Sequence, residues 1–308
     1  MAISFDTNHK PLIGETEQLE NDLVVITADN ASPMTFTGTR TYILGTENLI
    51  VIDPGPDSEA HLSSLMKYIG KRKVTDILLT HSHIDHSPLS RKLKIETGAR
   101  IIGFGSADEA RTSFMKKLSS SLDLGGEEGI DKDLALDKKV IDKQILNLNN
   151  YSIEVVHTPG HLSNHVCFSL KERQILFSGD HVMGWATTLI SPPDGDLGSF
   201  MNSLEKLSAR EEVIYYPGHG KPLKEPRKMV LAQIKHRRDR EKQILNSVSK
   251  ISRTPAEIVD EVYVGLNPML KAAAIRNVLA HLIDLYERDK VTSDKFSQTA
   301  KFSQSNEN

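Results

Sequence analysis

The chain has 308 residues, of which 38% are hydrophobic and 26% are charged. This composition is typical of a globular protein that buries a sizeable core, and it excludes a disordered chain. The sequence contains no apolar run near the roughly 18 residues of a membrane span. Its formal charge of −3 points to no class of partner, so the twelve histidines are the feature to follow.

The cysteine content and the first residues bear on the cellular compartment. The single cysteine, Cys167, excludes an internal disulfide and a thiolate zinc cluster. The first twenty residues lack the apolar segment of a secretory signal. We therefore expect a cytoplasmic protein without membrane association, and nothing in the sequence indicates an oligomeric state.

Strand and helix patterns alternate in the first hundred residues. Apolar runs of strand length occupy residues 23–27, 41–44, 49–52, 74–80 and 100–104. Apolar residues at helical spacing occupy residues 58–70 and 88–98. This order is typical of a layered α/β domain.

The middle of the chain continues the same mixed pattern. Helices are predicted at residues 107–122 and 196–207, and strands at 151–157, 165–170, 174–178 and 213–216. Residues 119–131 are rich in serine, glycine and acidic side chains, which predicts a surface insertion. We expect one mixed domain over residues 1–222.

The composition changes from Glu225 onward. A long helical segment over residues 227–248 is followed by a helix start signal at 254–257, and Asn267-Pro268 opens a third helix that ends near residue 289. Residues 291–308 are polar and weakly alternating, as in a small β-wing with a frayed tail. We predict a winged-helix-like domain over residues 223–308, with an all-helical cap as the alternative.

Four potential metal ligands follow the predicted strand 74–80 without a break, in His81-Ser82-His83-Ile84-Asp85-His86. Binding sites in open α/β sheets form at the carboxyl ends of strands. Alternation along an extended chain directs His81 and His83 to one side. A turn can bring Asp85 and His86 round to a second centre.

Three further candidates follow later strand signals, and each comes directly after a glycine: His161, Asp180 and His219. Glycine permits the backbone turn that exposes such a side chain. Together, five imidazoles and two carboxylates suit two zinc-class ions that share one bridging carboxylate. Because no thiolate is present, Mn²⁺ and Fe²⁺ are compatible with the same ligands.

This motif, with the later His, Asp and His in the same order, resembles the metallo-β-lactamase superfamily over roughly residues 20–222. The resemblance implies a four-layer αβ/βα sandwich with the metal site at one edge of the two sheets. It implies that His81, His83 and His161 hold one Zn²⁺ ion. It also implies that Asp85, His86 and His219 hold a second Zn²⁺ ion, and that Asp180 bridges the two ions. Asp53 matches a buried supporting aspartate of the family, although a turn-capping role is an equal alternative.

The ligand set predicts a hydrolase. Two cations a few Å apart lower the pKa of a shared water, and the metal-bridging hydroxide attacks a carbonyl carbon or a phosphorus atom. We expect Asp85 to ligate a metal and to act catalytically by orienting the hydroxide. His165, four residues after His161, is a second catalytic candidate, as a proton donor or phosphate ligand. A structural hydrogen-bonding role for His165 is equally open.

The substrate class follows from a narrower resemblance. Residues 178–188, 200–204 and 216–220 resemble the β-lactamase-like protein 2 subgroup, whose animal members are zinc-dependent endoribonucleases on single-stranded RNA and carry a C-terminal winged-helix-like domain. Residues 224–242 contain eight basic and three acidic side chains, which suits an anionic partner. A solvated helix face with internal ion pairs is the alternative. Trp185 lies five residues after Asp180, as a substrate contact or as loop packing.

We therefore predict a dinuclear metal-dependent phosphodiesterase or endoribonuclease that acts on single-stranded RNA. A thioesterase of the glyoxalase II kind is the main alternative, because it shares the ligand set. A β-lactamase is less favoured, because the main zinc β-lactamase subclasses have cysteine near the position of Asp180. A non-enzymatic nucleic-acid-binding module is also less favoured, because structural zinc sites are normally closed by four protein ligands.

Overall fold

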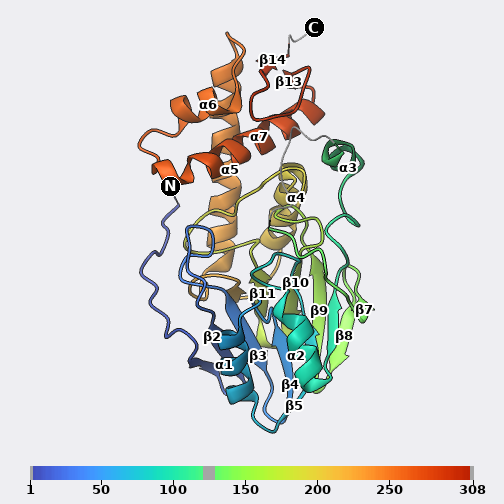
Figure 1. The fold of residues 1–308 in the computed structure, drawn as a ribbon. Coiled ribbons are helices and arrows are strands. Elements are labelled where there is room, and N and C mark those ends of the chain that lie inside the picture. The colour runs from blue at the N-terminus through green and yellow to red at the C-terminus, as the bar shows by residue number, and fades with distance from the viewer. Residues whose placement is uncertain (1–2, 121–128, 306–308) are drawn as a thin grey trace.

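Two β-sheets packed face to face form the core of the sandwich in the lower half of Figure 1. The computed structural model describes residues 3–120 and 129–305. The strands of the first sheet, in their spatial order, are β1 (Thr16–Glu20), β2 (Leu23–Thr27), β3 (Arg40–Leu44), β4 (Asn48–Ile52), β5 (Lys73–Leu78), β6 (Arg100–Gly103) and β7 (Lys138–Lys139). The strands of the second sheet, also in spatial order, are β12 (Ile214–Pro217), β11 (Ile175–Gly179), β10 (Val166–Leu170), β9 (Tyr151–His157) and β8 (Ile145–Leu148).

Alternating apolar side chains on the strands build the layers. In β2, Leu23 and Val25 face the core between the two sheets, while Val24 and Ile26 face the helices α1 (Glu59–Ile69) and α2 (Leu89–Thr97). The outer face of the second sheet packs against α4 (Leu197–Ser208) and the first part of α5 (Pro226–Val248). The result is the predicted four-layer αβ/βα sandwich.

The C-terminal segment forms a smaller body above the sandwich in Figure 1. It consists of α6 (Pro255–Val262), the 3₁₀ turn η2 (Pro268–Leu270), α7 (Lys271–Glu287) and the antiparallel strands β13 (Val291–Thr292) and β14 (Ser303–Gln304). A Thr254–Glu257 capping box begins α6, as its sequence signal predicts. The paired β13 and β14 confirm the winged-helix architecture, so the all-helical alternative is wrong.

Helix α5 belongs to both hydrophobic cores. Val230 and Ile234 in its first half pack against the second sheet and α4. Ile244 and Val248 in its second half pack into the core formed with α6 and α7. Within the described ranges, no helix has the length and apolar character needed to cross a bilayer.

The structure corrects two predictions between residues 107 and 131. The helix predicted at 107–122 is α3 (Ser113–Ser119), because residues 107–110 form a turn; residues 121 and 122 lie outside the described part. The surface insertion predicted at 119–131 lies mostly outside the described part as well. Its last residue, Asp131, is buried and binds Ser87 and Arg91, so this end of the segment packs against the histidine-rich loop.

Candidate metal centre

The predicted ligands converge at one edge of the sandwich because each follows the end of a strand. The motif of residues 81–86 follows β5, Asp180 follows β11 and His219 follows β12. His161 lies in the loop after β9. Strands β11 and β12 are parallel, which brings Asp180 and His219 to the same edge.

Three imidazoles form the first cluster. Nδ1 of His83 lies 2.9 Å from Nε2 of His81 and 3.0 Å from Nε2 of His161. Because Nδ1 of His83 has either one proton or one lone pair, it cannot form a full hydrogen bond with both Nε2 atoms. Residues His81, His83 and His161 therefore form a group suited to one cation.

The second cluster combines two imidazoles and one carboxylate. Oδ2 of Asp85 lies 3.2 Å from Nε2 of His86 and 3.2 Å from Nε2 of His219. The two ring nitrogens are 3.4 Å apart. These three groups are arranged to hold a second cation.

Asp180 lies between the two clusters. Its Oδ2 is 3.6 Å from Nε2 of His161 in the first cluster and 3.3 Å from Nε2 of His219 in the second. Its Oδ1 is 3.5 Å from Nε2 of His86 and accepts no hydrogen bond from the described residues, although it is buried. A buried carboxylate oxygen without a donor is the position expected of a metal ligand.

The charges of the two clusters differ in the absence of metal. Burial lowers the pKa of His83 to about 3 and holds that of His81 well below its usual value, so these rings are neutral and can donate lone pairs. Burial also acts to lower the pKa of His219, but Asp180 and Asp85 outweigh it and raise this pKa to about 9. A cation at the second cluster must therefore displace a proton.

The rear nitrogen of four rings is held by the protein. Nδ1 of His161 donates to the carbonyl oxygen of Leu189 at 2.9 Å, and Nδ1 of His219 donates to the carbonyl oxygen of Gly38 at 3.2 Å. The same pattern holds at His81, whose partner is Thr80 Oγ1 at 2.9 Å, and at His86, whose partner is Asp53 Oδ2 at 3.0 Å. These bonds fix the tautomers so that Nε2 of each ring faces the centre.

Asp53 supports the centre from behind. It accepts from the backbone N–H and the hydroxyl of Thr80 at 2.7 and 2.6 Å while it binds His86. Its backbone φ of 49° is uncommon for a residue other than glycine and marks a locally strained turn. The sequence signalled Asp53, but it gave no signal for the carbonyl groups of Gly38 and Leu189.

Gly218 is required by the close approach of the ligands. A Cβ at this position would overlap Oδ1 of Asp180 and lie 2.6 Å from Cε1 of His86. Both atoms belong to buried side chains. The glycine before His219 therefore makes space for two other ligands, a role that the sequence pattern did not predict.

Comparison with known proteins identifies the family. Residues 34–219 match the metallo-beta-lactamase superfamily. The chain belongs to the metallo-β-lactamase superfamily. Residues 254–297 also match the beta-lactamase associated winged helix domain, in agreement with the C-terminal body described above.

Known members of the superfamily resemble this chain over most of its length. A Beta-lactamase-like protein 2 homolog of Drosophila melanogaster is 33% identical over 297 residues, which cover 92% of this chain and 94% of the relative. An atrochrysone carboxyl ACP thioesterase of Paecilomyces divaricatus is 28% identical over 85% of this chain and 80% of the relative. The crystal structure of a metallo-β-lactamase family protein from Thermus thermophilus matches with a TM-score of 0.75 at 21% identity, covering 93% of this chain and 100% of that chain. The protein is a metal-dependent hydrolase of this superfamily.

His165 lies behind the metallo-β-lactamase centre and not on its solvent-exposed side. Its Nδ1 bonds Thr158 Oγ1 at 2.8 Å, and its Nε2 accepts from the backbone N–H of Asp180 at 3.2 Å. The side chain is fully buried. Because both ring nitrogens are occupied, the geometry favours the structural alternative for His165 over a role as proton donor or phosphate ligand.

Aromatic rings flank the superfamily site beside His219. Trp185 stacks on Phe36 with ring centroids 4.8 Å apart and an interplanar angle of 6°. Trp185 also packs on Gly220, so that a Cβ there would lie 3.0 Å from its Cδ1. Trp185 thus packs within the protein, and both rings remain partly exposed next to a predicted ligand.

The basic residues of 224–242 are mostly engaged within the protein. Five of the eight contact other groups of the chain: Lys228, Lys235, Arg237, Arg238 and Arg240. Within residues 3–120 and 129–305, the other three (Lys224, Arg227 and Lys242) have no ion-pair partner. This arrangement corresponds largely to the alternative of internal contacts, so the segment is a weak indication of a nucleic-acid partner.

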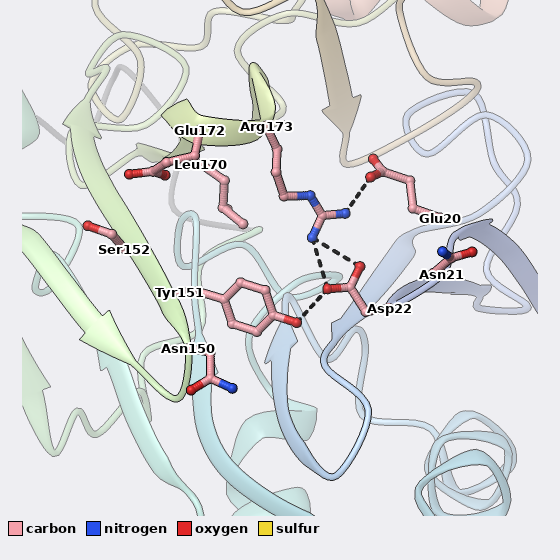
Figure 2. Close-up of a pocket in the computed structure, with 9 residues that line it drawn as sticks. All are labelled: Glu20, Asn21, Asp22, Asn150, Tyr151, Ser152, Leu170, Glu172 and Arg173. Carbon is pink, nitrogen blue, oxygen red and sulfur yellow. Dashed lines mark hydrogen bonds and ion pairs between the residues drawn. The ribbon is translucent and has the colours of Figure 1, made fainter.

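A hollow of about 880 Å³ lies at the end of the sandwich opposite the metal centre. Figure 2 shows Arg173 between the carboxylates of Glu20 and Asp22, with the hydroxyl of Tyr151 2.6 Å from Asp22. Glu20 and Asp22 come from the first sheet and its β1–β2 turn, whereas Tyr151 and Arg173 come from the second sheet and its η1 turn. These paired groups link the two sheets, and none of the residues that line the hollow is a candidate metal ligand.

Proposed function

We propose that this protein hydrolyses phosphodiester bonds of single-stranded RNA with two metal ions held by the clusters around Asp180. The observation that carries the proposal is the position of Asp180, whose oxygens lie within 3.6 Å of nitrogens in both clusters. The RNA substrate is supported by the likeness to a β-lactamase-like protein 2 homolog over nearly the full length of both chains. The animal members of the subgroup that this sequence resembles act on single-stranded RNA.

Zn²⁺ is the proposed metal, since the imidazole and carboxylate ligands suit it; Mn²⁺ and Fe²⁺ accept the same ligand atoms. The bound cations would supply a nucleophile from water at neutral pH and stabilise negative charge on the substrate. Asp85 is the residue positioned to accept a proton. Its Oδ2 is occupied by His86, His219 and the hydroxyl of Thr39, which donates to it at 3.1 Å.

The other oxygen of Asp85, Oδ1, has no hydrogen-bond partner among the described residues, and the side chain is 20% exposed. It can therefore take the proton of the attacking water as the new bond from oxygen to phosphorus forms, and return that proton to the leaving oxygen as its bond to phosphorus breaks. The partly exposed rings of Phe36 and Trp185 lie beside His219, where a base of the RNA can pack against them.

The test is cleavage of a labelled single-stranded RNA by the zinc-loaded protein, compared with Asp85→Asn and Asp180→Asn variants. We expect Asp85→Asn to retain metal and to lose roughly 10²–10⁴-fold in kcat, since it keeps an oxygen ligand and loses the proton acceptor. Asp180→Asn should lose metal as well as activity. Cleavage by both variants at the wild-type rate would show that the activity is a contaminant and would refute the proposal.

A thioesterase is the second candidate, supported by the likeness to an atrochrysone carboxyl ACP thioesterase over 85% of this chain. The same metal-binding residues can act on a thioester carbonyl, and the apolar rings of Phe36 and Trp185 suit an acyl group as well as a base. Turnover of S-lactoylglutathione or of an acyl-pantetheine thioester, without RNA cleavage, would favour this function. RNA cleavage without thioester turnover would exclude it.

A further inference from the structure

The loop after Asp180 supports both metal clusters from behind. Thr188 donates its hydroxyl to the carbonyl oxygen of Asp180 at 2.6 Å and contacts that of His181 at 3.2 Å. The next residue, Leu189, provides the carbonyl oxygen that receives Nδ1–H of His161 at 2.9 Å. The Thr188 hydroxyl therefore holds the backbone that carries Asp180, and the Leu189 carbonyl holds the ring of His161.

This loop is held in turn by two helices from beyond residues 34–219, the part that matches the metallo-β-lactamase superfamily. Arg237 of α5 donates Nη2–H to the carbonyl oxygen of Thr188. Asn277 of α7 accepts the backbone N–H of Ile190 at 3.1 Å through its Oδ1. The same Oδ1 receives Nη1–H of Arg237 at 3.3 Å, so the two side chains act as one unit.

The environment of Arg237 is unusual for a cation. Its side chain is 4% exposed and forms no ion pair with a carboxylate of residues 3–120 or 129–305. Burial lowers its pKa to about 10, which still leaves it protonated at neutral pH. A buried guanidinium that donates hydrogen bonds to a loop carbonyl oxygen and to an amide oxygen is suited to fix backbone geometry.

We propose that Arg237 and Asn277 are positioning residues of the metal centre, through which α5 and α7 hold the loop that orients Asp180 and His161. The C-terminal helices then contribute to metal affinity without supplying a ligand. This inference rests on the proposed dinuclear site. Supports that orient ligands commonly change metal affinity 10–100-fold when removed.

The test compares metal binding by the full chain in wild type and in Arg237→Met and Asn277→Leu. Zn²⁺ affinity is measured by competition with a chromogenic chelator, and ligand geometry by the visible absorption of the Co²⁺-substituted protein. We expect each variant to bind Zn²⁺ roughly 10–100-fold more weakly and to show an altered Co²⁺ spectrum. Asn277→Asp keeps the acceptor oxygen and should, in contrast to Asn277→Leu, bind Zn²⁺ with wild-type affinity.

Arg240→Met is the matched control. Arg240 lies one turn further along α5, donates to the carbonyl oxygen of Val262 at 3.1 Å and covers the ring of Tyr263 at 3.8 Å. It therefore makes the same type of contact away from the metal loop, and its loss should leave the affinity and the spectrum unchanged. Thermal unfolding of the metal-free variants separates weakened metal binding from a general loss of stability.

Wild-type affinity and spectrum in both Arg237→Met and Asn277→Leu would overturn the inference. An equal loss in Arg240→Met would overturn it too, because it would show a general effect of the helices. If Arg237→Met does not fold, Asn277→Leu and Asn277→Asp decide the matter. A wild-type protein that binds no metal would instead refute the dinuclear site itself.

Discussion

His83 is the imidazole on which the first cluster depends, since its Nδ1 lies within 3.0 Å of both of its partners. We expect His83→Ala to lose one metal ion and at least roughly 10³-fold in activity, because the nucleophile and the charge stabilisation both fail. The circular dichroism spectrum should remain that of the wild type. His236→Ala, a histidine on α5 away from the centre, is the control, and wild-type turnover by His83→Ala would remove His83 from the site.

Gly218 offers a test that changes no predicted ligand. Gly218→Ala should weaken metal binding strongly, because the added methyl group overlaps Asp180 and presses on His86. Gly70→Ala, at the end of α1, is the control: its Cβ would meet nothing within 4 Å, so only local strain from its φ of 59° is expected. Equal zinc affinity in Gly218→Ala and wild type would show that the pocket can expand.

The sequence revealed the candidate ligands and one of their supports, Asp53, but not the backbone groups that hold the other rings. His81, His83 and Asp85 stand out because imidazoles and carboxylates are crowded at the end of an apolar strand. The carbonyl groups of Gly38 and Leu189 could not be predicted, since every residue carries a carbonyl and only the fold determines which one faces a ring. His165 had the right spacing for a catalytic residue, but the backbone N–H of Asp180 occupies its Nε2.

Helix α5 runs through both hydrophobic cores. Ile244 is fully buried in the C-terminal core, while Trp185, the only tryptophan, lies beside the metal centre. We expect Ile244→Ala to lower the free energy of unfolding by about 2–5 kcal/mol. Because α5 couples the two cores, Trp185 fluorescence and far-ultraviolet circular dichroism should report the same shifted urea midpoint.

Two separate transitions in Ile244→Ala, with the fluorescence transition unchanged, would contradict this coupling. Leu245→Ala, at a partly buried neighbouring position, is the comparison and should cost less. A single transition in both proteins supports cooperative unfolding across α5.

Most helices and central strands could be predicted because their apolar periodicity is strong. Three strands were missed for different physical reasons. Strand β1 is largely exposed and polar, β7 has two residues, and β8 alternates between exposed and buried positions at the edge of its sheet. The helix expected at 107–122 is shorter because residues 107–110 form a turn, which is followed by Arg111, whose partner Asp194 lies far away in sequence.

Buried neutral histidines make the stability of the whole molecule depend on pH. Burial lowers the pKa of His61 to about 4, and burial with Arg237 and Arg240 does the same for His236. His281 is fully buried in α7, and its pKa is also well below 6.5. At pH values between these lowered pKa values and 6.5, the pKa of histidine in the unfolded chain, the unfolded chain binds more protons than the folded chain. The free energy of unfolding therefore falls as the pH falls.

We therefore expect the metal-free protein to be less stable in urea at about pH 5 than at about pH 7, by about 1.4 kcal/mol per pH unit for each excess proton bound on unfolding. His219 acts in the opposite sense, since its pKa is raised to about 9. Its contribution is fully present below pH 6.5 and is lost as the pH rises through 9, so between pH 7 and pH 5 it offsets only part of the acid effect of the three neutral histidines. A urea midpoint that is constant or higher at about pH 5 would contradict this prediction.

The paired charges of Arg173, Glu20 and Asp22 close the sandwich at the edge remote from the metals. Side chains of the protein alone hold that edge together, whereas the edge with the metal ligands depends on ions taken from solution. A chelator should therefore loosen only the edge with the metal ligands, so that ions leave and return while the two sheets stay together at the edge with Arg173. High ionic strength should instead loosen the edge with Arg173, because screening weakens partly exposed charge pairs.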